Sequence, residues 1–161
     1  GALISRVRDL YGKDNGFILI DVAGMLVNTT IVAATLAHLT ITPAKLSAPD
    51  IIEAVKLNRE MRLLGEKVGK PILHRLLLNE VSHLWPTYQR AALESVKSSG
   101  LVRFDTIIHE RAPFAEVFLT GETPHFADRT REPIVKAVAQ LDMLADEVLA
   151  LLQLESMQEA A

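Results

Sequence analysis

The stretch from Gly16 to Gly24 constrains this chain more than any other, because it joins an apolar run to a single carboxylate and a turn. A short apolar run such as Phe17–Ile20 is typical of a strand buried on both faces of a parallel sheet. A carboxylate inside that strand would be costly to bury, so we expect Asp21 at its carboxyl end. That end is the edge at which α/β proteins bind ligands, and Gly24 allows the backbone to approach a bound group closely.

Two interpretations of this stretch remain open. Many nucleotide hydrolases place an aspartate after a strand, followed by a glycine three residues later, to hold a magnesium-bound water beside a phosphate. The alternative is a buried strand whose Asp21 side chain stabilises the next turn by bonding to its own backbone.

The composition indicates one globular domain covering residues 1–161. The chain is 49% hydrophobic and 23% charged, with a formal net charge of −3, so neither disorder nor a general affinity for nucleic acid is indicated. It contains no cysteine, which excludes disulfides, thiolate catalysis and cysteine-bound zinc and fits a cytoplasmic location. The histidine spacings do not indicate a zinc site. The absence of an initiator methionine suggests a fragment or a processed chain.

Periodicity and capping residues predict alternating strands and helices. The expected strands cover 17–21, 39–42, 71–78 and 102–108, with Pro43 ending the second of them. The expected helices cover 2–11, 28–38, 84–98, 113–121 and 132–153, with a further helix from 47 to an end between Gly65 and Gly69. Residues 154–161 are expected to form a frayed tail. Because helices connect successive strands, the sequence predicts an α/β fold with three layers: a mainly parallel sheet with helices on both faces.

Polar residues gather at the expected carboxyl ends of these strands. Asp21 to Gly24, Pro43, Asn79 and the segment His109–Arg111 each follow an apolar strand. Ligands of parallel sheets lie outside these ends, so we expect the four groups to share one edge and one ligand. Their common position is a stronger signal than any one of them alone.

The same residues resemble the ParA/MinD-type ATPases, a family of P-loop NTPases with a deviant Walker A motif. Residues 17–24 resemble the Walker B strand and the switch that follows it. Thr40-Ile-Thr-Pro43 with Ser47 and Asp50 resembles the next strand and helix start, and Ile108-His-Glu-Arg111 with Phe114, Ala115 and Gly121 resembles the segment after the last core strand. The likeness is strongest to the branch that includes the ParA-like protein of T-DNA transfer, and it covers the C-terminal part of the family's fold.

The resemblance implies a protein that binds ATP with Mg²⁺, dimerises, and acts in plasmid or chromosome partition or in the recruitment of conjugative DNA. Asp21 would hold the metal through water, and Gly24 would lie beside the γ-phosphate. Pro43, Asn79, His109 and Arg111 would take part in nucleotide binding. Partners would be a second copy, DNA bound without sequence preference, and a partition or relaxosome protein.

The chain departs from the family at its most important motif. No Gly-x-x-x-x-Gly-Lys-Ser/Thr loop occurs, and this loop supplies the backbone N–H groups and the lysine that hold the phosphates. Where the family often has a basic residue after the position of Asn79, this chain has Glu80. We therefore expect this chain alone not to hydrolyse ATP. A degenerate interaction module without hydrolysis is the alternative function.

Each candidate residue also has a purely structural interpretation. Asn79 is either a contact to the base or a turn residue. Arg111 either contacts nucleotide or a second copy, or forms a salt bridge with Glu110 or Asp105. An acid–base pair of His109 and Glu110 is disfavoured, because adjacent residues of an extended segment point in opposite directions.

Basic residues are concentrated in one expected helix, where Lys56, Arg59 and Arg62 are the candidates for DNA binding. A solvated helix face is the commoner meaning of such a cluster. The C-terminal end, Leu154-Glu-Ser-Met-Gln-Glu, carries acidic residues where a helix binding anionic lipids would be basic, so no membrane partner is expected.

Overall fold

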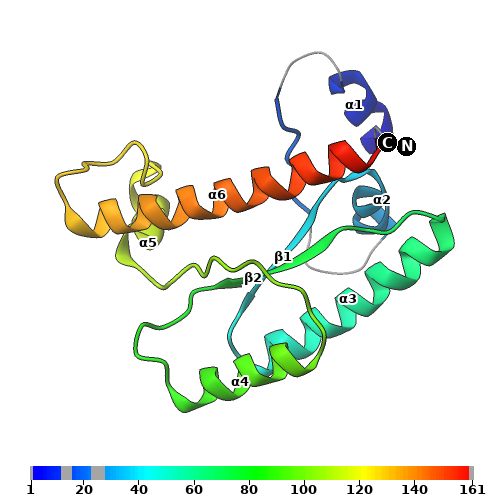
Figure 1. The fold of residues 1–161 in the computed structure, drawn as a ribbon. Coiled ribbons are helices and arrows are strands. Elements are labelled where there is room, and N and C mark those ends of the chain that lie inside the picture. The colour runs from blue at the N-terminus through cyan, green and yellow to red at the C-terminus, as the bar shows by residue number, and fades with distance from the viewer. Residues whose placement is uncertain (1, 12–15, 23–27, 160–161) are drawn as a thin grey trace.

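The computed structural model describes residues 2–11, 16–22 and 28–159, with side chains as far as Gln153. The described part contains six helices and a two-stranded sheet (Figure 1). The helices are α1 (Ala2–Leu10), α2 (Asn28–Leu36), α3 (Ala48–Val68), α4 (Thr87–Ser98), α5 (Ala112–Thr120) and α6 (Glu132–Glu159), and the strands are β1 (Thr40–Lys45) and β2 (His74–Asn79). The mixture of helices and parallel strands agrees with the predicted α/β class.

Strand β2 is the centre of the sheet, because its backbone is hydrogen-bonded on both edges. It pairs in parallel with β1 from Thr40 opposite His74 to Lys45 opposite Asn79. On its other edge, Leu76 forms a parallel bridge with Arg103, and Val81, just beyond the strand, forms one with His109. Three of the four segments predicted as strands therefore pair in parallel, although only two of them form a continuous sheet.

Alternate side chains of β2 form the core with α3 and α4. His74, Leu76 and Leu78 are buried, whereas the residues between them are half-buried. Leu76 and Leu78 belong to an apolar cluster that includes residues of both helices, among them Ile51, Ala54, Ala92 and Val96. Helix α3 packs against both strands, and α6 crosses the opposite side of the sheet (Figure 1).

Capping residues set the ends of the helices largely as the sequence predicts. The Ser47 side chain accepts a hydrogen bond from the Asp50 N–H at the start of α3. Gly69 and Gly121 end α3 and α5 in the left-handed conformation, with φ values of 71° and 74°. Helix α6 continues to Glu159, beyond the predicted end near Gln153.

The predicted strand over 17–21 is wrong. Residues 17–22 have no strand conformation and no backbone hydrogen bond to another described residue. The side chains of Phe17 and Leu19 are 75% and 94% exposed, although the sequence predicts their burial. A strand needs a neighbour to satisfy its backbone, and none of the described segments lies beside this one as a pairing partner.

The sequence predicts that Pro43 ends the second strand, but the structure places Pro43 within β1, opposite Leu77. The Thr40 N–H donates to the Leu73 carbonyl, so the even-numbered residues of β1 direct their N–H groups toward β2. The nitrogen of Pro43 therefore faces the other edge of β1. That edge has no partner among the described strands, and a proline is tolerated there because no ladder hydrogen bond is lost.

Residues 102–108 also differ from the prediction, because this stretch forms isolated bridges at Arg103 and, just beyond it, at His109 rather than a continuous strand. The interruption lies at Asp105 and Thr106. Their N–H groups donate to the two carboxylate oxygens of Glu147 on α6, at 2.7 and 3.0 Å. A side chain thus replaces the strand partner at this point, and the chain bends out of the ladder.

We predict that the buried His74 makes the fold less stable in mild acid. Its Nδ1 lies 2.9 Å from Asn58 Oδ1 and its Nε2 lies 2.8 Å from Thr42 Oγ1. Burial, assisted by the charge of Arg75, lowers the pKa of His74 below its usual value of 6.5. The stabilisation from the neutral ring is complete above the unfolded pKa and is lost as the pH falls toward the folded pKa.

Urea unfolding from about pH 7.5 to about pH 5.5 measures this effect, with a loss of up to about 1.4 kcal/mol per pH unit below 6.5. The variant His74→Gln keeps polar atoms at the site but cannot titrate. Its unfolding free energy should change less with pH than that of the unaltered chain. Equal slopes for the two proteins would show that His74 does not cause the acid sensitivity.

Candidate functional site

The candidate site is the edge of the sheet at the carboxyl ends of the strands. Lys45 and Asn79 are opposite each other at the ends of β1 and β2, and Pro43 lies two residues earlier. On the other side of β2, His109 forms a parallel bridge with Val81, two residues after the end of the strand. The structure therefore places the segment that begins at His109 beside the end of β2, where Asn79 lies, whereas Pro43 lies inside the neighbouring strand β1.

Asp21 is exposed, and no hydrogen bond or ion pair joins it to another residue that the structure describes. Its predicted place at the end of a buried strand is not found, because residues 17–22 form no strand. Gly24 lies outside the described residues.

A turn with unusual backbone geometry follows β2. Glu80 has a φ of 52°, in the left-handed region that residues other than glycine seldom adopt. Its carboxylate forms an ion pair with Lys45 at 2.6 Å, which connects the ends of the two strands. The pair raises the pKa of Lys45, mainly through the hydrogen bond that Lys45 donates to Glu80 and through the negative charge of Glu80. The negative charge of Glu80, which stands where the family often has a basic residue, is thus neutralised by Lys45.

Two histidines stack at this edge. The rings of His83 and His109 have centroids 4.2 Å apart and planes inclined by 18°. The Nδ1 atom of His109 lies 3.0 Å from the Val81 carbonyl oxygen, which can only accept, so Nδ1–H is the donor. His109 therefore stacks on His83, and no hydrogen bond or ion pair joins it to Glu110.

Arg111 is the N-cap residue of α5 and is held by a side chain of α6. Its Nε–H donates to Gln140 Oε1 at 2.9 Å, and Gln140 Nε2 donates to the Ile107 carbonyl at 3.1 Å. The salt bridge to Glu110 or Asp105 that the sequence analysis considered is not formed. Because Nε is the occupied atom, the two terminal nitrogens of the guanidinium group form no hydrogen bond to another described residue.

Sequence reasoning missed His83, Gln140 and Glu147. His83 is 26 positions before its stacking partner, and the intervening helix leaves no spacing pattern that relates them. Gln140 and Glu147 are seven residues apart on α6, two helical turns, which places both on the side that faces the 105–111 segment. The seven-residue spacing could have indicated a shared contact face, but polar residues on a long helix are commonly solvated, so the spacing alone does not predict this role.

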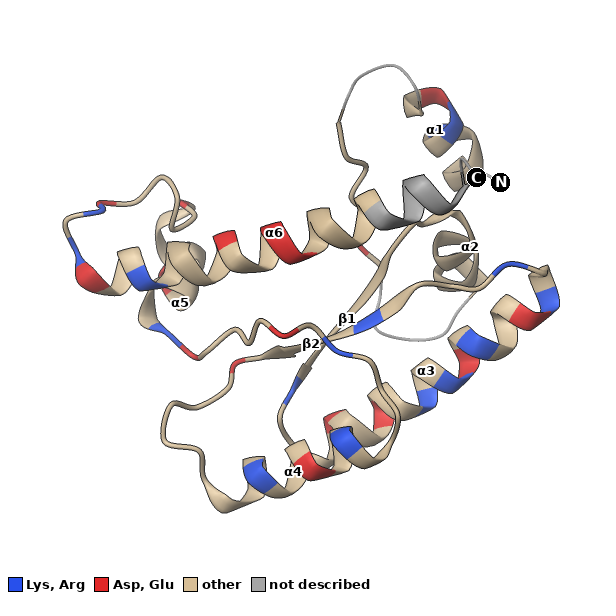
Figure 2. Ribbon diagram, viewed as in Figure 1, with Lys and Arg blue, Asp and Glu red and all other residues tan. Residues whose placement is uncertain are grey.

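The predicted DNA-binding residues lie on α3, where basic and acidic side chains are interspersed (Figure 2). Lys56 forms an ion pair with Glu53 at 2.6 Å, whereas Arg59 and Arg62 are exposed. Among the described residues, no group of three histidine or acidic side chains is arranged to hold a metal ion. Within the same residues, no helix has the length and apolar character needed to cross a bilayer.

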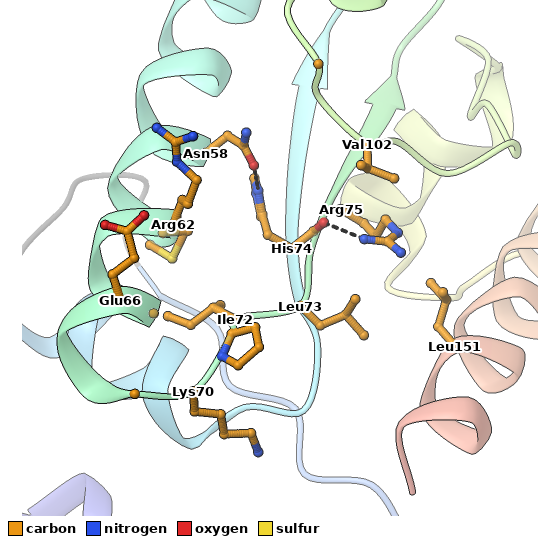
Figure 3. Close-up of a pocket in the computed structure, with 15 residues that line it drawn as sticks. Asn58, Arg62, Glu66, Lys70, Ile72, Leu73, His74, Arg75, Val102 and Leu151 are labelled. Atoms are coloured by element: carbon orange, nitrogen blue, oxygen red, sulfur yellow. Dashed lines mark hydrogen bonds between the residues drawn. The ribbon is translucent and has the colours of Figure 1, made fainter. Parts of the chain in front are cut away.

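A cavity of about 860 Å³ lies at the opposite end of the strands, where α3 leads into β2. Figure 3 shows that its two arginines do not converge, because Arg62 projects from α3 on one side of β2 and Arg75 projects toward Leu151 on the other. The Arg75 Nη1 atom donates to the carbonyl oxygen of His74. The geometry of the polar groups therefore favours the carboxyl edge over this cavity as the candidate site.

No protein-family model and no curated protein sequence matches this chain. The functional argument consequently depends on the residues and their geometry.

We predict that Glu147 holds the 105–111 segment in position. Replacing it with alanine leaves the Asp105 and Thr106 N–H groups without their acceptor and should lower the unfolding free energy by about 1–3 kcal/mol. Urea unfolding measures the loss. Asp146→Ala is the matched control, since the neighbouring Asp146 is exposed and has no hydrogen bond or ion pair within the described residues. Equal stabilities of the two variants would contradict this role of Glu147.

Proposed function

We propose that this chain is the C-terminal part of a ParA-like ATPase domain with a three-layer P-loop fold. The complete protein would bind ATP with Mg²⁺, dimerise, and act in plasmid or chromosome partition or in the recruitment of conjugative DNA. One observation supports the proposal: β1, β2 and the segment from Arg103 to His109 pair in parallel, so that Asn79 at the end of β2 lies near the segment that begins at His109. Ligands of parallel sheets bind at the edge where the carboxyl ends of the strands lie.

The exposed segment 17–22 fits this proposal. In the family that the sequence resembles, the strand of the phosphate loop lies against the strand that carries the Walker B aspartate. The present sequence contains no such loop, and the apolar side chains of Phe17 and Leu19 are left exposed. A neighbouring strand would cover these side chains and would satisfy the backbone of this segment.

The metal would be held by Asp21 through a water molecule. Its carboxylate is exposed and has no hydrogen-bond or ion-pair partner among the described residues, so it is free to accept from a hydrated Mg²⁺ ion. When bound, the ion would neutralise charge on the phosphates. Hydrolysis needs the lysine and the N–H groups of a phosphate loop, so we assign it to the complete protein alone. Arg59 and Arg62 of α3 are the side chains we propose for contacts with DNA phosphates.

The test of this proposal is nucleotide binding by the protein extended upstream of Gly1. We expect an in-frame phosphate loop in the upstream DNA and Mg²⁺-dependent ATP binding by the extended protein, measured by calorimetry. Asp21→Ala should weaken binding in the presence of Mg²⁺ by about tenfold or more, which corresponds to about 1.4 kcal/mol or more. Absence of Mg²⁺-dependent binding, or equal affinity of the Asp21→Ala variant, would overturn the proposal.

A second candidate function is association without hydrolysis. The outer edge of β1 has no strand partner among the described residues, and Phe17 and Leu19 expose apolar surface. Unpaired edges and apolar surface of this kind recruit other chains. This candidate predicts a natural reading frame that begins close to Gly1, with no phosphate loop upstream.

Under both functions, we expect the chain as given to self-associate. Light scattering after size-exclusion chromatography should detect species larger than the monomer, and Leu19→Ser should shift the distribution toward the monomer. Leu84→Ser is the matched control, because Leu84 is 89% exposed in the β2–α4 connection. A strictly monomeric chain with a cooperative unfolding transition would contradict self-association.

A further inference from the structure

The edge beyond β2 gathers positive and titratable side chains from three parts of the chain. His83 follows β2, His109 and Arg111 precede α5, and Lys136 lies in the first turns of α6. The stacked rings of the two histidines are the centre of this group. Only His109 and Arg111 were predicted as site residues, and they were assigned to nucleotide binding.

Several nitrogen atoms of these side chains form no hydrogen bond to another described residue. His109 donates its Nδ1–H to the Val81 carbonyl, so its Nε2 is the atom that gains a proton in acid. Neither that atom nor the ring nitrogens of His83 have a hydrogen-bond partner among the described residues. Arg111 uses Nε to bind Gln140, so both of its NH₂ groups are left over.

The positive groups affect one another electrostatically. The pKa of His83 is lowered, first by partial desolvation and then by the positive charges of His109, Arg111 and Lys136. The nearby acidic groups offset these charges only in part. Glu132 pairs with Lys136 at 2.5 Å and Glu80 pairs with Lys45, whereas Glu110 follows His109 and is exposed.

We propose that His83, His109 and Arg111 form a binding site for a phosphate-sized oxyanion whose affinity increases as the pH falls. Two stacked imidazolium rings repel each other, and an oxyanion that accepts from both rings and from the Arg111 guanidinium group removes this repulsion. Lys136 adds long-range attraction for the anion. The anion can be free phosphate or a phosphate group of a larger molecule, and the site does not depend on ATP binding at Asp21.

The direction of the pH effect follows from linkage. An anion bound beside the two rings favours their charged forms and therefore raises both pKa values. Reciprocally, protonation of the rings strengthens binding of the anion. Affinity should accordingly rise as the pH falls and the site gains positive charge.

The test is an NMR titration of the histidine ring protons with inorganic phosphate between pH 5 and 8. We expect phosphate to raise the pKa values of His83 and His109, and a rise of about one unit makes binding up to about tenfold tighter for each ring that becomes charged. Sulfate, which keeps its charge between pH 5 and 8, separates this effect from the change in the charge of phosphate itself. Sodium chloride at matched ionic strength should not reproduce these shifts. Unchanged histidine titrations in phosphate would overturn the proposal.

Variants separate this site from general screening. His83→Gln alters an exposed side chain, so it should leave the fold intact and reduce the pH dependence of binding to the part that His109 contributes. His125→Gln is the control, because His125 pairs with Asp142 away from this edge and its loss should leave phosphate binding unchanged. Equal effects of the two variants would contradict the site.

A comparison of ligands separates this inference from the proposed function. Binding of phosphate without Mg²⁺ and without adenosine supports the oxyanion site even if the extended protein fails to bind ATP. Conversely, if Mg²⁺-dependent ATP binding is present and phosphate leaves both histidines unaffected, the nucleotide site stands and the oxyanion site is rejected.

Discussion

The structure depends on strand β2 being hydrogen-bonded on both of its edges. Pairing with β1 and with the segment around Arg103 and His109 fixes the direction of three stretches that are far apart in the chain. The buried faces of Leu76 and Leu78 then anchor α3 and α4 on one side. Without this central ladder, the polar residues after each strand would have no common edge, and neither proposal about the site would have a geometric basis.

Side chains of helix α6 support the site by binding backbone groups of the 105–111 segment and the Arg111 side chain. Where the third segment leaves the ladder, the Glu147 carboxylate accepts from two of its N–H groups, and Gln140 binds both the Ile107 carbonyl and the Arg111 side chain. Each buried polar group of a bend needs a partner, and α6 supplies these partners from residues two turns apart. The helix therefore sets the position of the guanidinium group at the sheet edge.

Local signals predicted the parts of this structure that are determined locally. Ser47 caps the start of α3, and Gly69 and Gly121 end α3 and α5 in the left-handed conformation, as expected, because a cap depends on a few neighbouring residues. The apolar run 17–20 failed as a strand, since a periodic pattern specifies burial but not the neighbour that makes burial possible. Of the expected edge, the ends that carry Asn79 and His109 lie on neighbouring segments, but Asp21 does not follow a strand. The stacking of His83 on His109 depends on a loop conformation that no sequence pattern reports.

The proline in β1 limits what the outer edge of the sheet can accept. On that edge, the N–H groups available to an incoming chain belong to Ile41 and Lys45, with the ring of Pro43 between them. An added strand would lose one rung of the ladder and would meet the bulk of a pyrrolidine ring at its centre. Pairing of a second copy through this edge of β1 is therefore disfavoured. A short strand whose sequence leaves room for the proline ring would pair with it more readily than a long one.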